Sequence, residues 1–160
     1  MEKKFELTEN YVVNESGTKL YQIKCIKTFK YAKEGELGGY IEKEGNLSQE
    51  GDAWVYGNAR VYGNARVFGN ARVSGNACLK SNADHCGFDC FGSSNRHTHA
   101  YLTGYNTVEI TCGCFRGSIE EFEKKVKNTH AGTVYENQYN AIINVIKIKF
   151  GSAQRQNRQV

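Results

Sequence analysis

The chain of 160 residues has a net charge of +4, six cysteines, 17 glycines and no proline, which suits one turn-rich domain or two small ones. The charge is mild and forms no basic block, which excludes the pattern of an obligate nucleic-acid binder. Without a long apolar run or a signal-peptide pattern, the sequence predicts a cytoplasmic protein that does not cross a membrane and keeps its cysteines as thiols.

Residues 1–37 are expected to form a small antiparallel β sheet. Short apolar-polar alternations lie at residues 3–8 and 11–13, and a turn cluster follows at 14–17. Tyr21, Ile23 and Cys25 then share one face of a strand at period two. We expect this segment to cap the repeats that follow, because a terminal coil would otherwise expose apolar core and unpaired strand edges.

A six-residue repeat organises residues 38–84. Between Gly51 and Ala77, glycine recurs at every sixth position, with alanine two residues later and valine four residues later. Each hexad predicts a short strand with alternating sides and a Gly-Asn corner, because glycine adopts positive φ without penalty. Three hexads predict a triangular coil of roughly eighteen residues. On that geometry the stacked pairs are Val55 on Val73, Val61 on Leu79 and Val67 on His85.

The outward positions of the hexads alternate arginine with an aromatic ring. These residues are Tyr56, Arg60, Tyr62, Arg66, Phe68 and Arg72, and Trp54 begins the series. The simpler interpretation is a solvated surface with modest cation–π contacts. The alternative is a contact surface, because Tyr, Trp and Arg are enriched at interface hot spots. Such a surface would serve either self-association or a foreign partner.

Residues 85–150 predict a ββαα module. Two β-prone runs, at 97–102 and 108–115, flank a Gly/Asn turn and indicate a hairpin. Ser118 and Glu121 form a capping box that predicts a helix to about residue 129. Thr133 and Glu136 form a second capping box, which predicts a helix of about four turns. Residues 151–160 lack periodicity and are expected to be a mobile tail.

Two segments resemble known proteins. Residues 37–61, which begin L-G-G-Y-I-E-K, are similar to the start of the repeats in hexapeptide-repeat proteins of bacteriophages and prophages. Residues 111–130, with the helix of Tyr135 and Tyr139 that follows, resemble a C-terminal module of uncharacterised phage proteins. The resemblance implies a left-handed coil and a phage-borne accessory role in the host cytosol, of the kind that includes antagonism of host defence.

The resulting fold prediction is mainly β. It consists of a short left-handed parallel β-helix of hexapeptide repeats, with an N-terminal β cap and a C-terminal ββαα module. The expected divisions are a cap at 1–37, the β-helix at 38–84, the hairpin and two-helix module at 85–150 and the tail at 151–160.

Three groups of residues are candidates for chemistry. An acyltransferase on this fold would use a histidine base, but the repeats contain none before His85 and no loop that could shape a pocket. A zinc site would draw on Cys86, Cys90, Cys112 and Cys114. A free cysteine is, however, a common core residue. A nucleophile–base pair would join Cys114 to His97, His99 or His130, with no third group to orient them.

The sequence therefore favours a non-enzymatic binding protein without a cofactor. The repeats would act as a rigid scaffold and as the face of a dimer or trimer, with the C-terminal module as the recognition head. The expected partner is a host protein or an anionic ligand such as a nucleotide or nucleic acid. A hexapeptide acyltransferase-like enzyme and a zinc-binding protein are the alternatives. The contact candidates are Tyr56, Arg60, Tyr62, Arg66, Phe68, Arg72, Arg96, Arg116 and Lys124.

Overall fold

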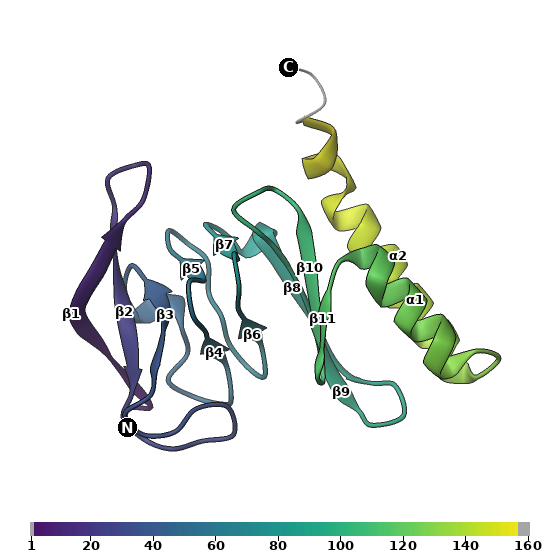
Figure 1. Ribbon diagram of the computed structural model, residues 1–160, viewed down its shortest axis with the longest axis horizontal. Coiled ribbons are helices and arrows are strands. Elements are labelled where there is room, and N and C mark those ends of the chain that lie inside the picture. Colours follow the sequence, from purple (N-terminus) through teal and green to yellow (C-terminus); the bar gives the residue numbers. More distant parts are fainter. Residues whose placement is uncertain (1, 157–160) are drawn as a thin grey trace. The chain divides into compact units, whose positions relative to one another are not determined.

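The computed structural model describes residues 2–156. The chain divides into two compact units, Met1–His85 and Cys86–Val160, which we call unit 1 and unit 2 (Figure 1). Unit 1 contains the N-terminal strands and the hexads. Unit 2 contains a four-stranded sheet and both helices.

The fold class expected from the repeats is wrong. The chain is mixed α/β, with antiparallel and mixed sheets and two helices, and it does not form a left-handed parallel β-helix of hexapeptide repeats. The physical reason is that the hexads supply strands of only two residues. Two of these short strands extend the sheet begun by the N-terminal hairpin, and unit 2 adds two helices and an antiparallel sheet.

The main sheet of unit 1 has five strands. They are β1 (Phe5–Val13), β2 (Lys19–Cys25), β3 (Leu37–Ile41), β5 (Arg60–Val61) and β7 (Cys78–Leu79), in that spatial order. The first three pair antiparallel, and the last two join in parallel. A separate parallel pair consists of β4 (Trp54–Val55) and β6 (Arg72–Val73). The expected N-terminal cap is therefore continuous with the repeats rather than a separate layer.

The hexad period nevertheless determines which residues pair. Val55 is the register partner of Val73, and Val61 is the partner of Leu79, so these two expected pairs are confirmed. Val67 forms a single parallel bridge with Leu47, whereas His85, its expected partner, begins strand β8. The alanines and valines of the hexads are buried, and the five hexad glycines from Gly51 to Gly75 all have positive φ. Glycine corners and an aliphatic interior are thus the parts of the repeat that the structure retains.

Strand β3 passes very close to the first hexads. A Cβ atom on Gly39 would lie 2.7 Å from the carbonyl oxygen of Ala59, and the same oxygen accepts a backbone hydrogen bond from Tyr40. Since the obstructing atom is a backbone oxygen held by that hydrogen bond, it cannot rotate aside. Gly39 is therefore required by packing and not by its φ angle.

A buried lysine fastens the N-terminus to the hexads. Lys4 Nζ donates to the carbonyl oxygens of Ala53 at 2.8 Å and Gly51 at 3.1 Å, and it lies 4.9 Å from the centre of the Phe29 ring. Desolvation lowers the pKa of Lys4 to about 8, although Asp52 and Cys25 oppose that shift. The ammonium group is thus held by carbonyl dipoles and an aromatic face, with much of its hydration lost.

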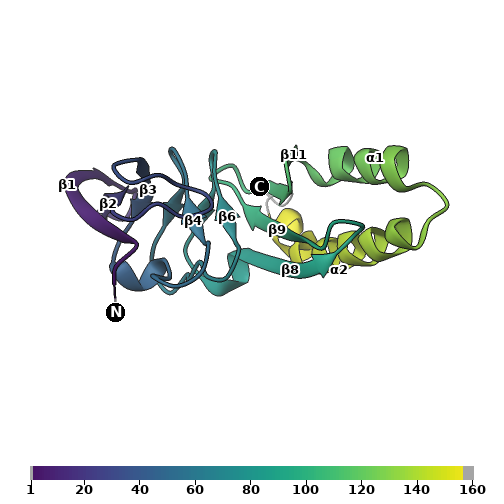
Figure 2. The same cartoon turned by 90° about the horizontal axis from the view of Figure 1, so that it is seen from below.

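Unit 2 packs two helices on one face of an antiparallel sheet. The strands are β8 (His85–Phe91), β9 (Arg96–Leu102), β10 (Val108–Cys112) and β11 (Phe115–Gly117), in the order β11-β10-β9-β8. The sequence predicted only the middle two strands, so the expected ββαα module is corrected to ββββαα. Helices α1 (Ile119–His130) and α2 (Val134–Gln156) run side by side (Figure 2). Buried side chains of both helices and of β9 and β10 form one apolar core.

The helix limits follow from local capping. Ser118 and Glu121 form the expected capping box at the start of α1, with Glu121 N donating to Ser118 Oγ at 3.2 Å. At the start of α2, Glu136 accepts from Gly132 N at 2.8 Å. Helix α2 continues to Gln156, so it enters the segment predicted as a tail, and residues 157–160 lie outside the described residues. Neither helix in the described part of the chain is long and apolar enough to span a membrane.

We predict that Gly39→Ala destabilises the protein by about 1–3 kcal/mol, because the new methyl group overlaps the Ala59 carbonyl. Gly45→Ala is the matched control, since a Cβ atom there meets nothing within 4 Å and the φ angle is ordinary. Urea unfolding of both variants measures the difference. Equal midpoints for the two variants would show that β3 does not approach the hexads this closely.

We predict that Lys4 makes folding more favourable as pH rises above 8. The folded pKa of about 8 lies below the unfolded value near 10.5, so the unfolded chain binds more protons between these values. The free energy of unfolding of the wild type, measured against Lys4→Met, should therefore rise by about 1–2 kcal/mol between roughly pH 7.5 and 9.5. A constant difference across this range would mean that Lys4 is hydrated in the folded protein.

Candidate functional site

The aromatic and arginine residues of the hexads do not form three equivalent faces. Trp54 is fully buried between Phe5 and Phe29, with ring centres 6.4 Å and 5.4 Å apart in edge-on geometry. It is the register partner of Arg72 across β4 and β6, and it occupies the hexad position that holds arginine at residues 60, 66 and 72. The segment around residues 29–32 therefore covers this part of the repeat exterior.

The same segment also engages Tyr56 and Arg72. The Tyr56 hydroxyl donates to the carbonyl oxygen of Tyr31 at 3.1 Å, and the Arg72 guanidinium lies 5.0 Å from the centre of the Tyr31 ring. Burial raises the pKa of Tyr56 to about 12. Both predicted contact residues thus contribute to the fold of unit 1.

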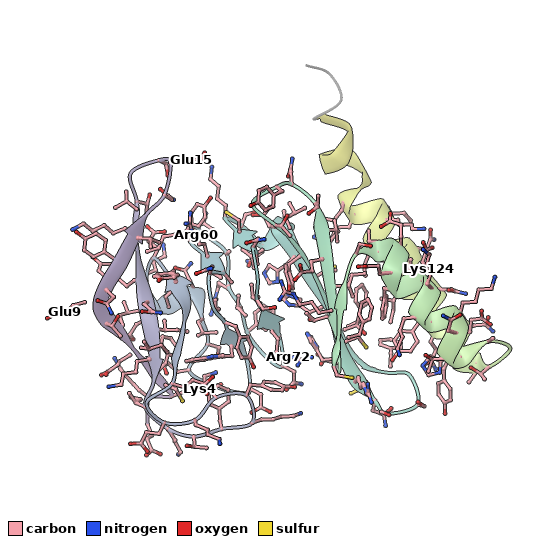
Figure 3. The ribbon with its side chains drawn as sticks, in the orientation of Figure 1. Lys4, Glu9, Glu15, Arg60, Arg72 and Lys124 are labelled. Carbon is pink, nitrogen blue, oxygen red and sulfur yellow. The ribbon has the colours of Figure 1, made fainter. Side chains whose placement is uncertain are left out.

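Arg60 and Tyr62 belong to the five-stranded sheet. Arg60 is half-buried between its register partners Tyr40 and Cys78. The Tyr62 hydroxyl lies 3.7 Å from Cys78 Sγ, and burial raises the pKa of Tyr62 to about 12. Arg60 and Arg72 lie on different strands of unit 1 (Figure 3). These residues are partly shielded and are weak candidates for binding a foreign partner.

Arg66 and Phe68 differ from the other hexad residues. They flank Val67, both are exposed, and 62% of the Phe68 surface is accessible. Neither side chain has a hydrogen bond, ion pair or ring contact with any other described residue. An arginine and a phenyl ring are therefore presented to solvent two positions apart.

The backbone that carries this exposed pair is held on both sides. Val67 N donates to the Asn46 carbonyl at 2.8 Å, and Val67 O accepts from Ser48 N at 2.9 Å. The buried Asn46 amide donates to Ala65 O at 2.8 Å, and Arg66 N donates to Asn82 Oδ1 at 2.9 Å. The backbone is thus fixed before any partner binds, which reduces the entropic cost of association.

The predicted contact residues of unit 2 lie in different settings. Arg116 is bound to Glu109, with Nε–Oε1 at 2.5 Å and Nη2–Oε2 at 3.3 Å, and this pairing raises the pKa of Arg116. Arg96 is exposed, and its guanidinium lies over Gly113 in the β10–β11 turn. Lys124 is exposed on α1 (Figure 3). The structure does not gather these three cations into one group.

A polar row lies on the sheet face of unit 2 that is turned away from the helices. His97 Nδ1 is 2.7 Å from Asp89 Oδ1, and the rings of His97, His99 and Tyr101 follow at centre distances of 5.7 Å and 5.6 Å. The Tyr101 hydroxyl donates to Glu109 Oε1 at 2.5 Å. A carboxylate that orients an imidazole is an arrangement used by general bases and by metal ligands. Here His99 and Tyr101 have almost no solvent-exposed surface.

Sequence reasoning missed Asp89, Tyr101 and Glu109 in this row, and Lys4 in unit 1. The sequence does contain a pattern that predicts the row. His97, His99 and Tyr101 occupy every second position of one strand, so they share one of its faces. Asp89 and Glu109 could not be placed without the strand register. Lys4 gave no signal, because a lysine near an N-terminus is ordinarily exposed.

The cysteines are dispersed between core and surface. Cys112 is buried, where it accepts from Thr98 Oγ1 at 3.3 Å and lies 3.7 Å from the Tyr139 hydroxyl. Cys86 borders the core, and desolvation raises the pKa of its thiol. Cys90 and Cys114 are exposed. Across residues 2–156, no group of three or more His, Cys, Asp or Glu side chains is placed to hold a metal ion.

All three histidines of the nucleophile–base pairs considered from the sequence contact other side chains, and His99 lies beside the Tyr101 ring with centres 5.6 Å apart. His97 is bound to Asp89, and His130 stacks on Tyr139 with ring centres 5.4 Å apart. The acyltransferase alternative rested on a β-helix, which the observed fold does not contain.

No protein-family model matches the chain, and no curated protein matches its sequence.

We predict that a thiol reagent modifies Cys90 and Cys114 rapidly in the native protein, because both are exposed. Cys25 and Cys112 should react only after denaturation, and Cys86 should react slowly because burial raises its thiol pKa. Mass spectrometry of timed samples, with peptide mapping, assigns each site. Protection of Cys90 or Cys114 that a chelator removes would instead indicate a bound metal ion.

Proposed function

We propose that the chain is a non-enzymatic accessory binding protein that acts in the cytosol. Its contact surface is the exposed pair Arg66 and Phe68, and its partner is a protein that offers a carboxylate beside an apolar pocket. One observation carries the proposal. Among the predicted contact residues of the hexads, Tyr56 and Arg72 both contact Tyr31 of the same chain. Arg66 and Phe68, by contrast, have no side-chain partner among the described residues.

The chemistry of the pair supports a protein partner. An exposed aromatic ring can fill an apolar pocket, and an adjacent guanidinium can bind a carboxylate with two hydrogen bonds. A nucleic acid is a weaker match, because the hexad segment 39–84 has five basic and five acidic residues and so no net charge. The resemblance of residues 37–61 and 111–130 to bacteriophage proteins supports a partner from a bacterial host, and antagonism of host defence is the corresponding role.

We predict that Arg66→Ala/Phe68→Ala weakens partner binding by roughly 30-fold or more while the free energy of unfolding changes little, because hot-spot truncation costs about 2 kcal/mol or more. The full chain is immobilised, proteins are captured from bacterial lysate and identified, and the affinity of the captured protein is then measured. Phe91→Ala/Arg96→Ala is the matched control, since it removes an exposed phenyl ring and an exposed arginine from unit 2.

Two results would contradict the proposal. In one, the Arg66/Phe68 variant binds like the wild type and the Phe91/Arg96 variant does not, which would place recognition in unit 2. In the other, the chain binds a single-stranded oligonucleotide with a steep salt dependence and captures no protein, which would make nucleic acid the ligand.

A further inference from the structure

Helix α2 has an apolar face on each side. Its inner face contributes Tyr139, Ile142, Ile143, Ile146 and Phe150 to the core of unit 2. A second set consists of Val134, Ala141, Val145 and Ile148, which we call the outer stripe. Successive residues of a helix turn by 100°, so these four residues lie within an arc of about 60°, roughly opposite the core face.

The outer stripe is exposed. The accessible fractions are 61% for Val134, 47% for Val145 and 72% for Ile148, and Ala141 is also exposed. The spacing of seven, four and three residues is the spacing of one seam of a coiled coil. A helix that is apolar on two faces ordinarily buries both. Helix α1 offers a contrast, because its buried residues Ile119, Phe122 and Val126 all lie on one side.

The charges around the stripe identify its occupant. Lys147 is paired with Glu123 at 2.6 Å, and Glu136 is bound to the backbone of Gly132 at 2.8 Å. Between Val134 and Ile148 the stripe is bordered by the uncharged residues Asn137, Asn144 and Gln138. Among the residues of α2 whose side chains the structure describes, Lys149 is the one charged residue beside it. An uncharged seam gives a charged partner helix nothing to pair with, whereas an identical uncharged seam matches it without a buried charge.

We propose that the outer stripe binds the same stripe of a second copy of this chain, with the two α2 helices antiparallel and crossing at Ala141. In that arrangement Val134 of each copy lies opposite Ile148 of the other, and the small Ala141 permits close approach at the crossing. Each Lys149 lies opposite Thr133, away from its equivalent. A parallel pair would place the two Lys149 side chains together, which like charges disfavour.

The size of the stripe sets the strength of the dimer. The contact spans about 21 Å of helix from Val134 to Ile148. One such helix pair buries less than the roughly 1,200 Å² of a stable interface, so the dimer is weak, with a Kd of about 0.1–1 mM. This contact is independent of the Arg66/Phe68 surface, so either proposal can fail without the other.

Sedimentation equilibrium of the full chain, from roughly 20 µM to 1 mM, tests the proposal at the concentrations where such a dimer forms. The average mass should rise from 18.0 kDa toward twice that value. Val145→Lys/Ile148→Lys should weaken the association at least tenfold. The matched control, Val13→Lys/Tyr105→Lys, changes two exposed apolar residues elsewhere by the same charge and should associate like the wild type. A monomeric wild type, or equal behaviour of the two variants, overturns the proposal.

Cysteine cross-linking tests the antiparallel orientation in a Cys90→Ser/Cys114→Ser background. Chains with Val134→Cys, mixed with chains with Ile148→Cys, should form mixed cross-linked dimers at least fivefold faster than Ile148→Cys chains alone. Cross-linking of Ile148→Cys chains at an equal or faster rate would show that the helices are not antiparallel.

Discussion

Glycines with positive φ turn the chain of unit 1 at six-residue intervals, and the arrangement of its hexads depends on this turn. Each corner leaves room for only a short strand, so the alanine and valine between two corners point inward and pair in parallel with the hexad three repeats later. The corners also explain why so few residues can face outward. What those residues contact then depends on the segments that lie over them.

The N-terminal segments determine those contacts. Phe29 and Tyr31 cover Trp54, Tyr56 and Arg72. Lys4, which precedes β1, donates to hexad carbonyl groups. Arg66 and Phe68 receive no such cover. The outward positions of the hexads are nearly uniform in sequence, but in the folded unit only Arg66 and Phe68 among the predicted contact residues of the hexads are exposed. This difference in exposure comes from residues outside the repeat.

Much of the local structure was predictable from the sequence. The capping box at Ser118, the apolar spacing of α1 and the pairing of Val55 with Val73 all follow from short-range patterns. The fold class was not, because a period describes one hexad and does not reveal that β5 and β7 extend an antiparallel hairpin sheet. The candidate site was predicted only as a set of nine residues. Distinguishing Arg66 from Arg72 required knowing where Tyr31 lies, which no local pattern contains.

Hydroxyl-radical footprinting of the full chain, read by mass spectrometry at single residues, measures whether Arg66 and Phe68 are more accessible to solvent than the other hexad exteriors. Tryptophan is intrinsically more reactive than phenylalanine toward hydroxyl radicals, so a phenylalanine is labelled faster only where it is much more accessible to solvent. We predict that Phe68 is labelled faster than Trp54 and that Tyr56 is also protected. Trp54 and Tyr56 are both shielded by the segment around Tyr31. Faster labelling of Trp54 than of Phe68 would show that the hexad exteriors are equivalent and would contradict the assignment of Arg66 and Phe68 as the contact surface.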